Sequence, residues 1–413
     1  MYYNASEMEK GLGILNNQKI SSKFPVWITF SGHLTNDLYE SFIIGLIPIL
    51  KDRFVLSLFM VALLTSVGTL SGSLSQPIFG YLADRLQIKY FMVFGLLLHS
   101  ILLSIIGILP NYYLILIFIF IGNLGNSAFH PSSASVAGHF GGSRKGLSSS
   151  LIALGGHTGY SIGALIIILI FTQFGLKYVP IAMILGIIMA LIIYKYIPSV
   201  NLNKSIDNIL VQNSYKRIIR NAGTFPIIII FLSSYIKDLI WLALVTFMPL
   251  YLKDFNLKLI NIGFIILLFS LMGGLGGLIT GTLYDKYKKG IVNIQINLII
   301  SIVLIYLLFH SEVLMIPVIF IITGFFLIST QPIYIRIFQD IFPKNLSLSS
   351  SVVLGFSAGL AAVTMIFLGK VADKIGSSRL ITYLLIPLFI MTVFLVFLNI
   401  FNKRFSILKN ISL

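Results

Sequence analysis

Long runs of apolar residues separated by short polar segments make up most of this chain. Each run is long enough, at about 1.5 Å per residue, for a helix to cross a hydrocarbon core about 30 Å thick. The pattern predicts twelve membrane-spanning helices, near residues 25–50, 55–79, 90–109, 112–137, 147–171, 177–197, 225–251, 260–283, 290–309, 313–336, 348–369 and 380–401. The fold class predicted is therefore an all-α integral membrane protein.

One connection is longer and more polar than the others. It covers residues 198–224 and divides the spans into two sets of six. We therefore expect five regions: an N-terminal segment 1–24, a six-helix bundle 25–197, a linker 198–224, a second six-helix bundle 225–401 and a tail 402–413.

The two sets of spans are related by an internal repeat. Residues 201 positions apart match, as with Pro25 and Pro226, and with Asp37 and Asp238. Further matches at the same offset join residues 48 and 249, 72 and 273, 80 and 281, 84 and 285, and 131 and 332. Such agreement of prolines, glycines and aspartates predicts two pseudo-symmetric bundles in the same orientation, as in large secondary transporters.

Composition supports a bilayer environment. Of 413 residues 57% are hydrophobic and only 10% are charged, and the mean hydropathy is +0.98. A soluble domain carries about 25% charged residues, which is far more. The net charge of +16 does not indicate nucleic acid, because the basic residues lie in short loops between spans. The absence of cysteine excludes disulfides and thiolate chemistry.

The basic residues also predict the orientation. With the N-terminus inside, 20 of the 29 Lys and Arg residues lie on the inner side and 8 on the outer side. Positive residues favour the cytoplasmic side. We therefore expect a multi-pass protein of the cell membrane (plasma or inner membrane) with both termini in the cytoplasm, and no cleaved signal peptide.

A short motif in the inner loop after the second span is repeated after the eighth. The first copy contains Gly80, Asp84 and Arg85, and the second contains Gly281, Asp285 and Lys286. Glycine allows two helix ends to approach closely, and the aspartate can pair with a helix N-terminus or a nearby cation. We interpret these six residues as gating residues, against the alternative of a tight polar loop.

Small residues recur at four-residue spacing on four spans. They are Gly155, Gly159 and Gly163 on the fifth, Gly273, Gly277 and Gly281 on the eighth, Gly68 and Gly72 on the second, and Gly355 and Gly359 on the eleventh. Such stripes let helix backbones touch in lipid. We expect them at the seams between the bundles, where they would slide as the halves rock.

Ionisable residues inside a span are costly, so they are candidates for function. His33, Asp37 and Glu40 share one face of the first span, with Asn36 beside them. We predict that they carry protons, and the alternative is a buried pair of Asp37 with His33 that fixes the helix. Lys237 and Asp238 lie at a similar depth in the seventh span, and Lys237 could attract an anionic substrate.

The remaining histidines carry weaker predictions. His157 could line a cavity, His130 precedes a kink at Pro131 and is expected to be structural, and His99 is expected to be peripheral. No metal-ligand spacing and no phosphate-binding loop occurs. We therefore expect no metal, no cofactor, no catalytic residue and no ATP hydrolysis, and an ion gradient as the energy source.

The loop motif resembles the signature of the major facilitator superfamily. Two stretches narrow the likeness: Gly32 to Pro48, and Ala128-Phe129-His130-Pro131 with the glycine- and arginine-containing segment after it. They are similar to the fosmidomycin resistance subfamily. The resemblance implies a proton-driven exporter of small molecules, with a cavity formed by spans 1, 4, 7 and 10. On that basis the cavity candidates are Asn36, Asp37, Glu40, Lys237 and Asp238. Together with His157, the residues Asn36, Lys237 and Asp238 are our candidate substrate-binding residues.

We therefore predict a secondary active transporter, and not an enzyme. Its partners would be a small molecule, protons and the lipid bilayer, with no nucleic acid, and the chain would act as a monomer. Uptake by proton symport of a small, anionic solute is the alternative within transport. A polytopic membrane enzyme would need more catalytic groups at membrane depth, and a sensor would need a soluble domain that termini of this length do not supply.

Overall fold

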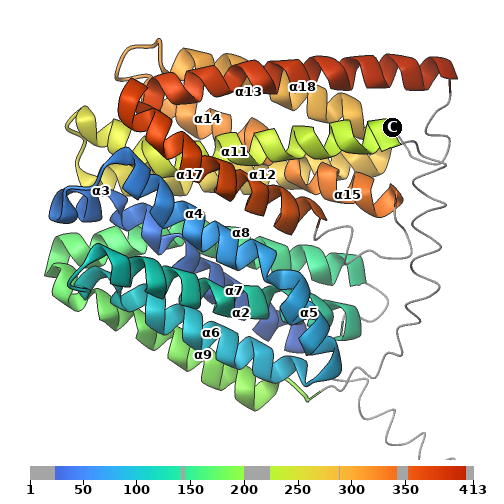
Figure 1. Ribbon diagram of the computed structural model, residues 1–413. Coiled ribbons are helices and arrows are strands. Elements are labelled where there is room, and N and C mark those ends of the chain that lie inside the picture. Colours follow the sequence, from blue (N-terminus) through green and yellow to red (C-terminus); the bar gives the residue numbers. More distant parts are fainter. Residues whose placement is uncertain (1–23, 141–144, 200–223, 288, 342–351, 406–413) are drawn as a thin grey trace, which may run out of the picture.

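The computed structural model describes residues 24–140, 145–199, 224–287, 289–341 and 352–405. All of the regular elements in these ranges are helical. They form two layers that run side by side along a common axis (Figure 1). The N-terminal layer is drawn in blue to green, and the C-terminal layer in yellow to red.

Six helical crossings make up the N-terminal half. The first two are broken, α2 (Phe24–Glu40) with α3 (Phe42–Phe54) and α4 (Leu58–Leu74) with α5 (Gln76–Arg85). The others are α6 (Ile88–Ile105) with η2 (Ile106–Ile108), α7 (Tyr112–Phe140), α8 (Lys145–Phe174), and η4 (Leu176–Ala182) with α9 (Met183–Tyr196).

The C-terminal half repeats this order. Its crossings are α11 (Thr224–Asp254), α12 (Leu259–Tyr287), α13 (Gly290–Leu308), α14 (Ile316–Ile328) with α15 (Gln331–Ile341), η5 (Val352–Ser357) with α17 (Ala358–Ile375), and α18 (Ser377–Phe405). Within the described ranges, therefore, the predicted fold of two six-helix bundles is confirmed.

Eleven of these crossings are long and apolar enough to span a membrane. The pair α2 and α3 is not among the eleven, and it carries His33, Asn36, Asp37 and Glu40. Because polar groups inside a bilayer are costly, their concentration on one crossing makes it the first candidate for the functional site.

Several helices are longer than the hydropathy pattern indicates. The second crossing ends at Arg85 and not near residue 79, and α17 ends at Ile375 and not near residue 369. The tenth reaches Ile341. Hydropathy detects the part of a helix within the hydrocarbon, whereas the helix itself continues through the polar interface. The linker 198–224 lies almost wholly outside the described residues.

Each half has its own core. Tyr39, Phe42 and Phe129 are buried in the N-terminal one. In the C-terminal core the rings of Phe269 and Phe320 stack with centroids 4.2 Å apart. Each half therefore has a core of its own, with a few buried residues of the other half packed against it.

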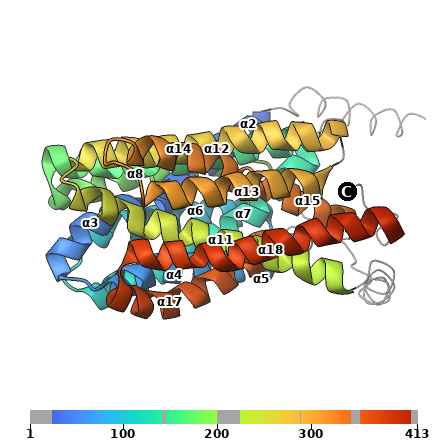
Figure 2. The ribbon, with the colours of Figure 1, turned by 90° about the horizontal axis from the view of Figure 1, so that it is seen from above.

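The two halves meet along two helix pairs. The pairs are α8 with α12 and α4 with α17, and α11 also packs on α3 and α4. Figure 2 shows α12 and α14 along one edge of the bundle and α4 and α17 along the other. The fifth crossing therefore packs on the eighth, and the second on the eleventh, across the two halves.

The glycine stripes mostly do not lie on these seams, which corrects the sequence interpretation. Gly159 and Gly163 of α8 face the backbone carbonyls of Leu34 and Leu38 in α2, within the same half. The α12 glycines at 273 and 277 likewise face α14 and α15. Only α17 and its leading turn behave as expected, since Gly355 and Gly359 face residues 73 and 74 of the other half. Most stripes thus hold each half together.

Candidate functional site

Three titratable side chains meet inside the N-terminal half, and we call them the His-Asp-His cluster (His33, Asp37 and His130). His33 Nε2 lies 3.3 Å from Asp37 Oδ2, and His130 Nε2 lies 3.6 Å from Asp37 Oδ1. The two imidazoles contact each other, with His33 Nε2 3.0 Å from His130 Nδ1. No side chain of the cluster is more than 24% exposed. The cluster is therefore held away from bulk water.

Local sequence explains how the cluster forms. His33 and Asp37 are four residues apart on α2, so they share a face. His130 approaches from α7, and the other ring nitrogen of His33, Nδ1, lies 2.8 Å from the carbonyl oxygen of Ile152 in α8. Gly156 stands opposite, and a Cβ there would lie 2.9 Å from His33 Nε2 and closer still to Asp37 Oδ2. Glycine thus makes room for the contact between the two side chains.

Asn36 extends the cluster into a buried polar network. Its amide Nδ2 donates to Asp37 Oδ1 at 3.0 Å and to Asn126 Oδ1 at 2.5 Å. Its carbonyl oxygen lies 3.2 Å from His99 Nδ1. Asn36 and His99 are both fully buried. The expectation that His99 is peripheral is therefore wrong, and Asn36 positions Asp37 without lining an open pocket.

A second buried cluster lies in the C-terminal half. Lys237 pairs with Asp238 and donates to Gln331 Oε1. Ser357 donates to the other carboxylate oxygen of Asp238. The Lys237 ammonium is thus neutralised by a carboxylate, and its side chain is only 5% exposed. In this conformation the ammonium is not presented to an anionic ligand.

The two clusters occupy equivalent positions of the internal repeat. At the offset of 201, Asp37 corresponds to Asp238 and Asn36 to Lys237. His33, His130 and Gly156 correspond to residues 234, 331 and 357, which are Ser, Gln and Ser. Histidines surround the aspartate of the N-terminal half, whereas a lysine and neutral side chains surround its counterpart. Of these two equivalent aspartates, therefore, Asp37 is flanked by imidazoles and Asp238 is not.

Glu40 lies one turn beyond Asp37, in a small pocket between the halves. The pocket is also lined by Thr65, Asn123, Tyr160 and Trp241. The rings of Tyr160 and Trp241 come from opposite halves and have centroids 6.0 Å apart. In this conformation its volume is about 30 Å³, room for about one water molecule. The halves would therefore have to separate before a small organic molecule could bind beside the acidic group and the two rings.

The other predicted residues are placed as follows. His157 is exposed, and its Cβ faces Gly274 of α12 across the halves. A Cβ at Gly80 would meet Pro131 of its own half at 3.5 Å, and one at Gly281 would have open space. The side chains of Asp84 and Arg85 lie outside the described residues. Asp285 lies at the end of α12, and Lys286 lies over the ring of Tyr287.

The geometry of the His-Asp-His cluster also bears on metal binding. Its ligand atoms all lie within 4.8 Å of one another. The 3.0 Å between His33 Nε2 and His130 Nδ1 is a hydrogen-bond distance. Ligand atoms that share a tetrahedral zinc at about 2.0–2.1 Å direct their lone pairs at the ion and not at each other. In the conformation described, the contact between the two imidazoles is therefore that of a hydrogen bond.

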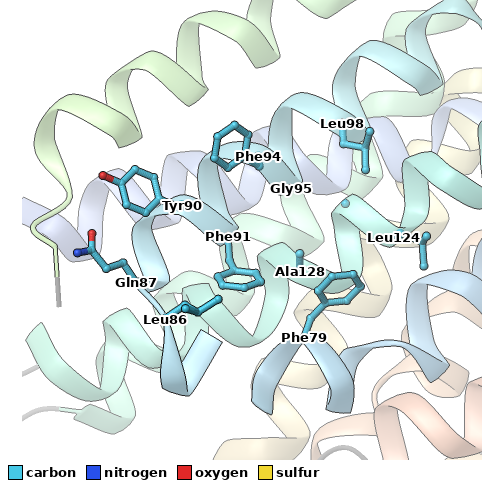
Figure 3. A pocket seen from close by; sticks show the side chains of 11 residues that line it. Phe79, Leu86, Gln87, Tyr90, Phe91, Phe94, Gly95, Leu98, Leu124 and Ala128 are labelled. Carbon is cyan, nitrogen blue, oxygen red and sulfur yellow. The ribbon is translucent and has the colours of Figure 1, made fainter. Parts of the chain in front are cut away.

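A larger groove lies elsewhere, on the outer surface of the N-terminal half between α5, α6 and α7 (Figure 3). Its volume is about 670 Å³. Phe79, Phe91 and Phe94 contribute much of its wall, and Gln87 is at one end. No charged side chain lines it. Its chemistry matches acyl chains, and it is separate from the buried clusters.

Comparison with known proteins agrees with this architecture. The sequence profile described as the Major Facilitator Superfamily matches residues 29–349. The chain belongs to this superfamily. As a member of the Major Facilitator Superfamily, it is a multi-pass membrane transporter, and its structural neighbours are transporters and not enzymes.

Two curated relatives of this superfamily member cover most of its length. The fosmidomycin resistance protein of Escherichia coli (strain K12) is 25% identical over 349 residues, which are 83% of this chain and 84% of that protein. The uncharacterised MFS-type transporter YfnC of Bacillus subtilis (strain 168) is 26% identical over 357 residues, 83% of this chain and 85% of that protein. The predicted resemblance to the fosmidomycin resistance subfamily is therefore confirmed, at low sequence identity.

Solved structures of the superfamily share the fold. The nucleoside transporter NupG has a TM-score of 0.73 at 12% identity, covering 90% of this chain and 98% of that chain. A bacterial homologue of the human lysosomal transporter Spinster, inward-facing and occupied, also has a TM-score of 0.73 at 12% identity, with coverages of 91% and 96%. The peptide transporter POT has a TM-score of 0.71 at 13% identity, covering 92% of this chain and 95% of that chain.

We expect the C-terminal ion pair to be structural. Replacing Lys237 alone with Met leaves the buried Asp238 without its cation, which costs about 3–5 kcal/mol for a buried pair. Lys237→Met should therefore lower the thermal unfolding temperature of the protein in detergent markedly. Lys237→Met combined with Asp238→Asn should recover most of that loss. If the double variant were as unstable as the single one, the pair would not explain the position of Lys237.

Proposed function

We propose that this transporter is a proton-coupled exporter of small molecules that works by alternating access, with the His-Asp-His cluster as its proton site. The proposal includes action as a monomer in the cell membrane, with both termini cytoplasmic. The observation that carries it is the buried contact of Asp37 with two histidines.

The hydrogen-bond geometry supports a stored proton. The carbonyl oxygen of Ile152 only accepts, so His33 Nδ1 must carry a hydrogen. If His33 were neutral, its Nε2 lone pair would face the Asp37 carboxylate at 3.3 Å. That repulsion disappears if one further proton lies on His33 or on Asp37. A carboxylate with two neutral imidazoles leaves this repulsion in place. The observed arrangement therefore fits best if the cluster holds one additional proton.

Comparison of the two halves supports the same assignment. Asp238 is permanently balanced by Lys237, so it has no need of a proton. Asp37 has no lysine or arginine among the partners described above, and its balance depends on histidines. A charge that comes and goes with a proton can bias two conformations differently, and this differential interaction is what coupling requires.

The pocket at Glu40, Tyr160 and Trp241 is the proposed substrate site. It lies between the halves and next to the proton site, because Asn126 contacts Asn36 on one side and Glu40 on the other. Substrate and proton could therefore compete through a shared network. Since one relative is a fosmidomycin resistance protein, fosmidomycin is the first compound to test.

The decisive experiment measures transport in vesicles of known orientation. Wild-type protein in inside-out vesicles should accumulate substrate when the lumen is made acidic, and the accumulation should collapse when a protonophore is added. A preceding growth screen, in a host without its own efflux pumps, would identify the substrate from a panel that includes fosmidomycin.

The orientation of transport provides the control. Accumulation only in right-side-out vesicles with an inward proton gradient would identify an uptake symporter and overturn export. Accumulation that ignores a protonophore would overturn proton coupling, while leaving the membership of the superfamily intact.

A further inference from the structure

We propose that Asp373, at the end of α17, is a gate-positioning residue that latches the two halves together at the end of the molecule opposite the repeated loop motif. The latch end is the left-hand end of Figure 1, where α3 ends and α18 begins. By the orientation proposed above it faces the outside of the cell. The inference concerns the movement of the halves and does not depend on proton coupling.

Asp373 binds the first turn of a helix in the other half. Its Oδ1 accepts from the backbone N–H of Leu58 at 2.6 Å, and its Oδ2 lies 3.3 Å from the N of Phe59. Leu58 is the first residue of α4, where backbone N–H groups have no partner within the helix. A carboxylate at a helix N-terminus gains both the hydrogen bonds and the favourable dipole. A side chain of one half thus supplies what the backbone of the other half lacks.

Neighbouring residues of α17 support the same contact. Lys370 Nζ lies 5.3 Å from the centre of the Phe59 ring, a cation–π distance. A Cβ at Gly369 would lie 2.8 Å from the Cβ of Ala62 and 2.9 Å from the Cα of Phe59. Glycine at 369 therefore allows the close approach of α17 to α4 that brings Asp373 within reach.

Two further polar contacts join the halves on this side. Asp52 at the end of α3 pairs with Lys253 at the end of α11. These residues are 201 positions apart, so they are equivalent in the repeat and meet across the pseudo-twofold axis. Deeper in, the hydroxyls of Thr65 and Thr246 are 2.8 Å apart. The latch end is therefore closed by contacts at more than one depth.

The sequence around Asp373 is a third copy of the loop motif. Gly369-x-x-x-Asp373-Lys374 has the spacing of Gly80-x-x-x-Asp84-Arg85 and Gly281-x-x-x-Asp285-Lys286. Each half of the superfamily fold is itself built from inverted three-helix repeats. The middle helices of such repeats end on opposite sides, so a copy on the eleventh crossing falls at the opposite end from the copies on the second and eighth. The same sequence motif thus occurs at both ends of the molecule.

The test measures the distance between the halves at the latch end. The chain has no cysteine, so Val55→Cys and Lys258→Cys would carry the only two spin labels. Both positions are exposed, one just after α3 and the other in the loop after α11. Asp373→Ala in this background should shift the ratio of long-distance to short-distance populations by roughly 3- to 30-fold, as expected for loss of a helix cap. Measurements are made at one pH, without a gradient or substrate.

Matched variants separate the latch from general damage. Asp254→Ala removes another exposed aspartate at the same end and should leave the distances unchanged. Asp373→Asn keeps the shape of the side chain and a weaker hydrogen-bond acceptor, so it should give an intermediate shift of the ratio. It also provides a second test if Asp373→Ala fails to fold. Asp52→Asn should shift the ratio at most about fivefold, because that pair is largely solvent-exposed.

An unchanged distance distribution in folded Asp373→Ala and Asp373→Asn would overturn the latch. The same shift should appear in an Asp37→Asn background, where proton coupling is absent by design. Failure of the proton proposal would therefore leave this result standing, and failure of the latch would leave the proton proposal untouched.

Discussion

Asp37→Asn is expected to reduce proton-driven accumulation of substrate to the level of vesicles without protein. Asparagine has nearly the shape of aspartate and can keep the hydrogen bonds within the network. It cannot carry a negative charge or accept a proton, so His33 and His130 would lose the anion that now balances them. The cluster would then hold the same charge in both conformations, and a proton gradient would no longer bias the cycle.

Downhill exchange of substrate should survive in this variant, because binding at Glu40, Tyr160 and Trp241 does not need the Asp37 carboxylate. Labelled and unlabelled substrate would be exchanged across the vesicle membrane without a gradient. Asp254→Asn, an exposed residue at the end of α11, is the matched control and should behave as wild type. Retention of full gradient-driven transport by Asp37→Asn would remove the proton site from Asp37.

Gly156→Ser is expected to abolish coupled transport nearly as completely. The new Cβ would lie 2.9 Å from His33 Nε2 and closer to Asp37 Oδ2, so these side-chain ends must separate. Its hydroxyl would then occupy the position that Ser357 occupies in the other half, where it donates to Asp238. The variant therefore turns the proton site into a copy of its unprotonated counterpart, and the fold is expected to remain.

Two other glycines provide the comparison. Gly159→Ala places a methyl group against the carbonyl of Leu34 and should lower the folding yield, since backbone cannot move aside cheaply. Gly274→Ala meets only the Cβ of His157, at 3.6 Å, and should be silent in both transport and thermal unfolding. If Gly156→Ser kept coupled transport, or lost it only by failing to fold, the proposed role of the glycine would be wrong.

The fold could be predicted from the sequence because bilayer physics acts on every residue of a span. Length, hydropathy and the 201-residue repeat together specify the number of crossings and the two bundles. The direction in which a small residue points could not be predicted in this way. The stripe on α8 faces α2, because Gly159 and Gly163 must accommodate the carbonyls of Leu34 and Leu38.

Only part of the candidate site could be predicted from the sequence, for a related reason. His33 and Asp37 are recognisable as a pair by their spacing on one helix. His130 and Gly156 come from α7 and α8, and spacing along one helix says nothing about such partners. The internal repeat could have identified these two residues, because aligning the halves at the offset of 201 places His130 on Gln331 and Gly156 on Ser357. Buried polar residues that differ between the halves in this way are a guide to asymmetric chemistry.

The third motif copy has an energetic consequence. When one kind of bond is broken at the first face and re-formed at the second, the two end points of the cycle acquire similar free energies. When two conformations have similar free energies, a few kcal/mol of binding energy from one ion or one ligand is enough to reverse their populations. If the copies at both faces act as the proposed latch does, the duplication of Gly-x-x-x-Asp with a following cation is expected to make the direction of transport depend on what is bound and not on a built-in preference of the scaffold.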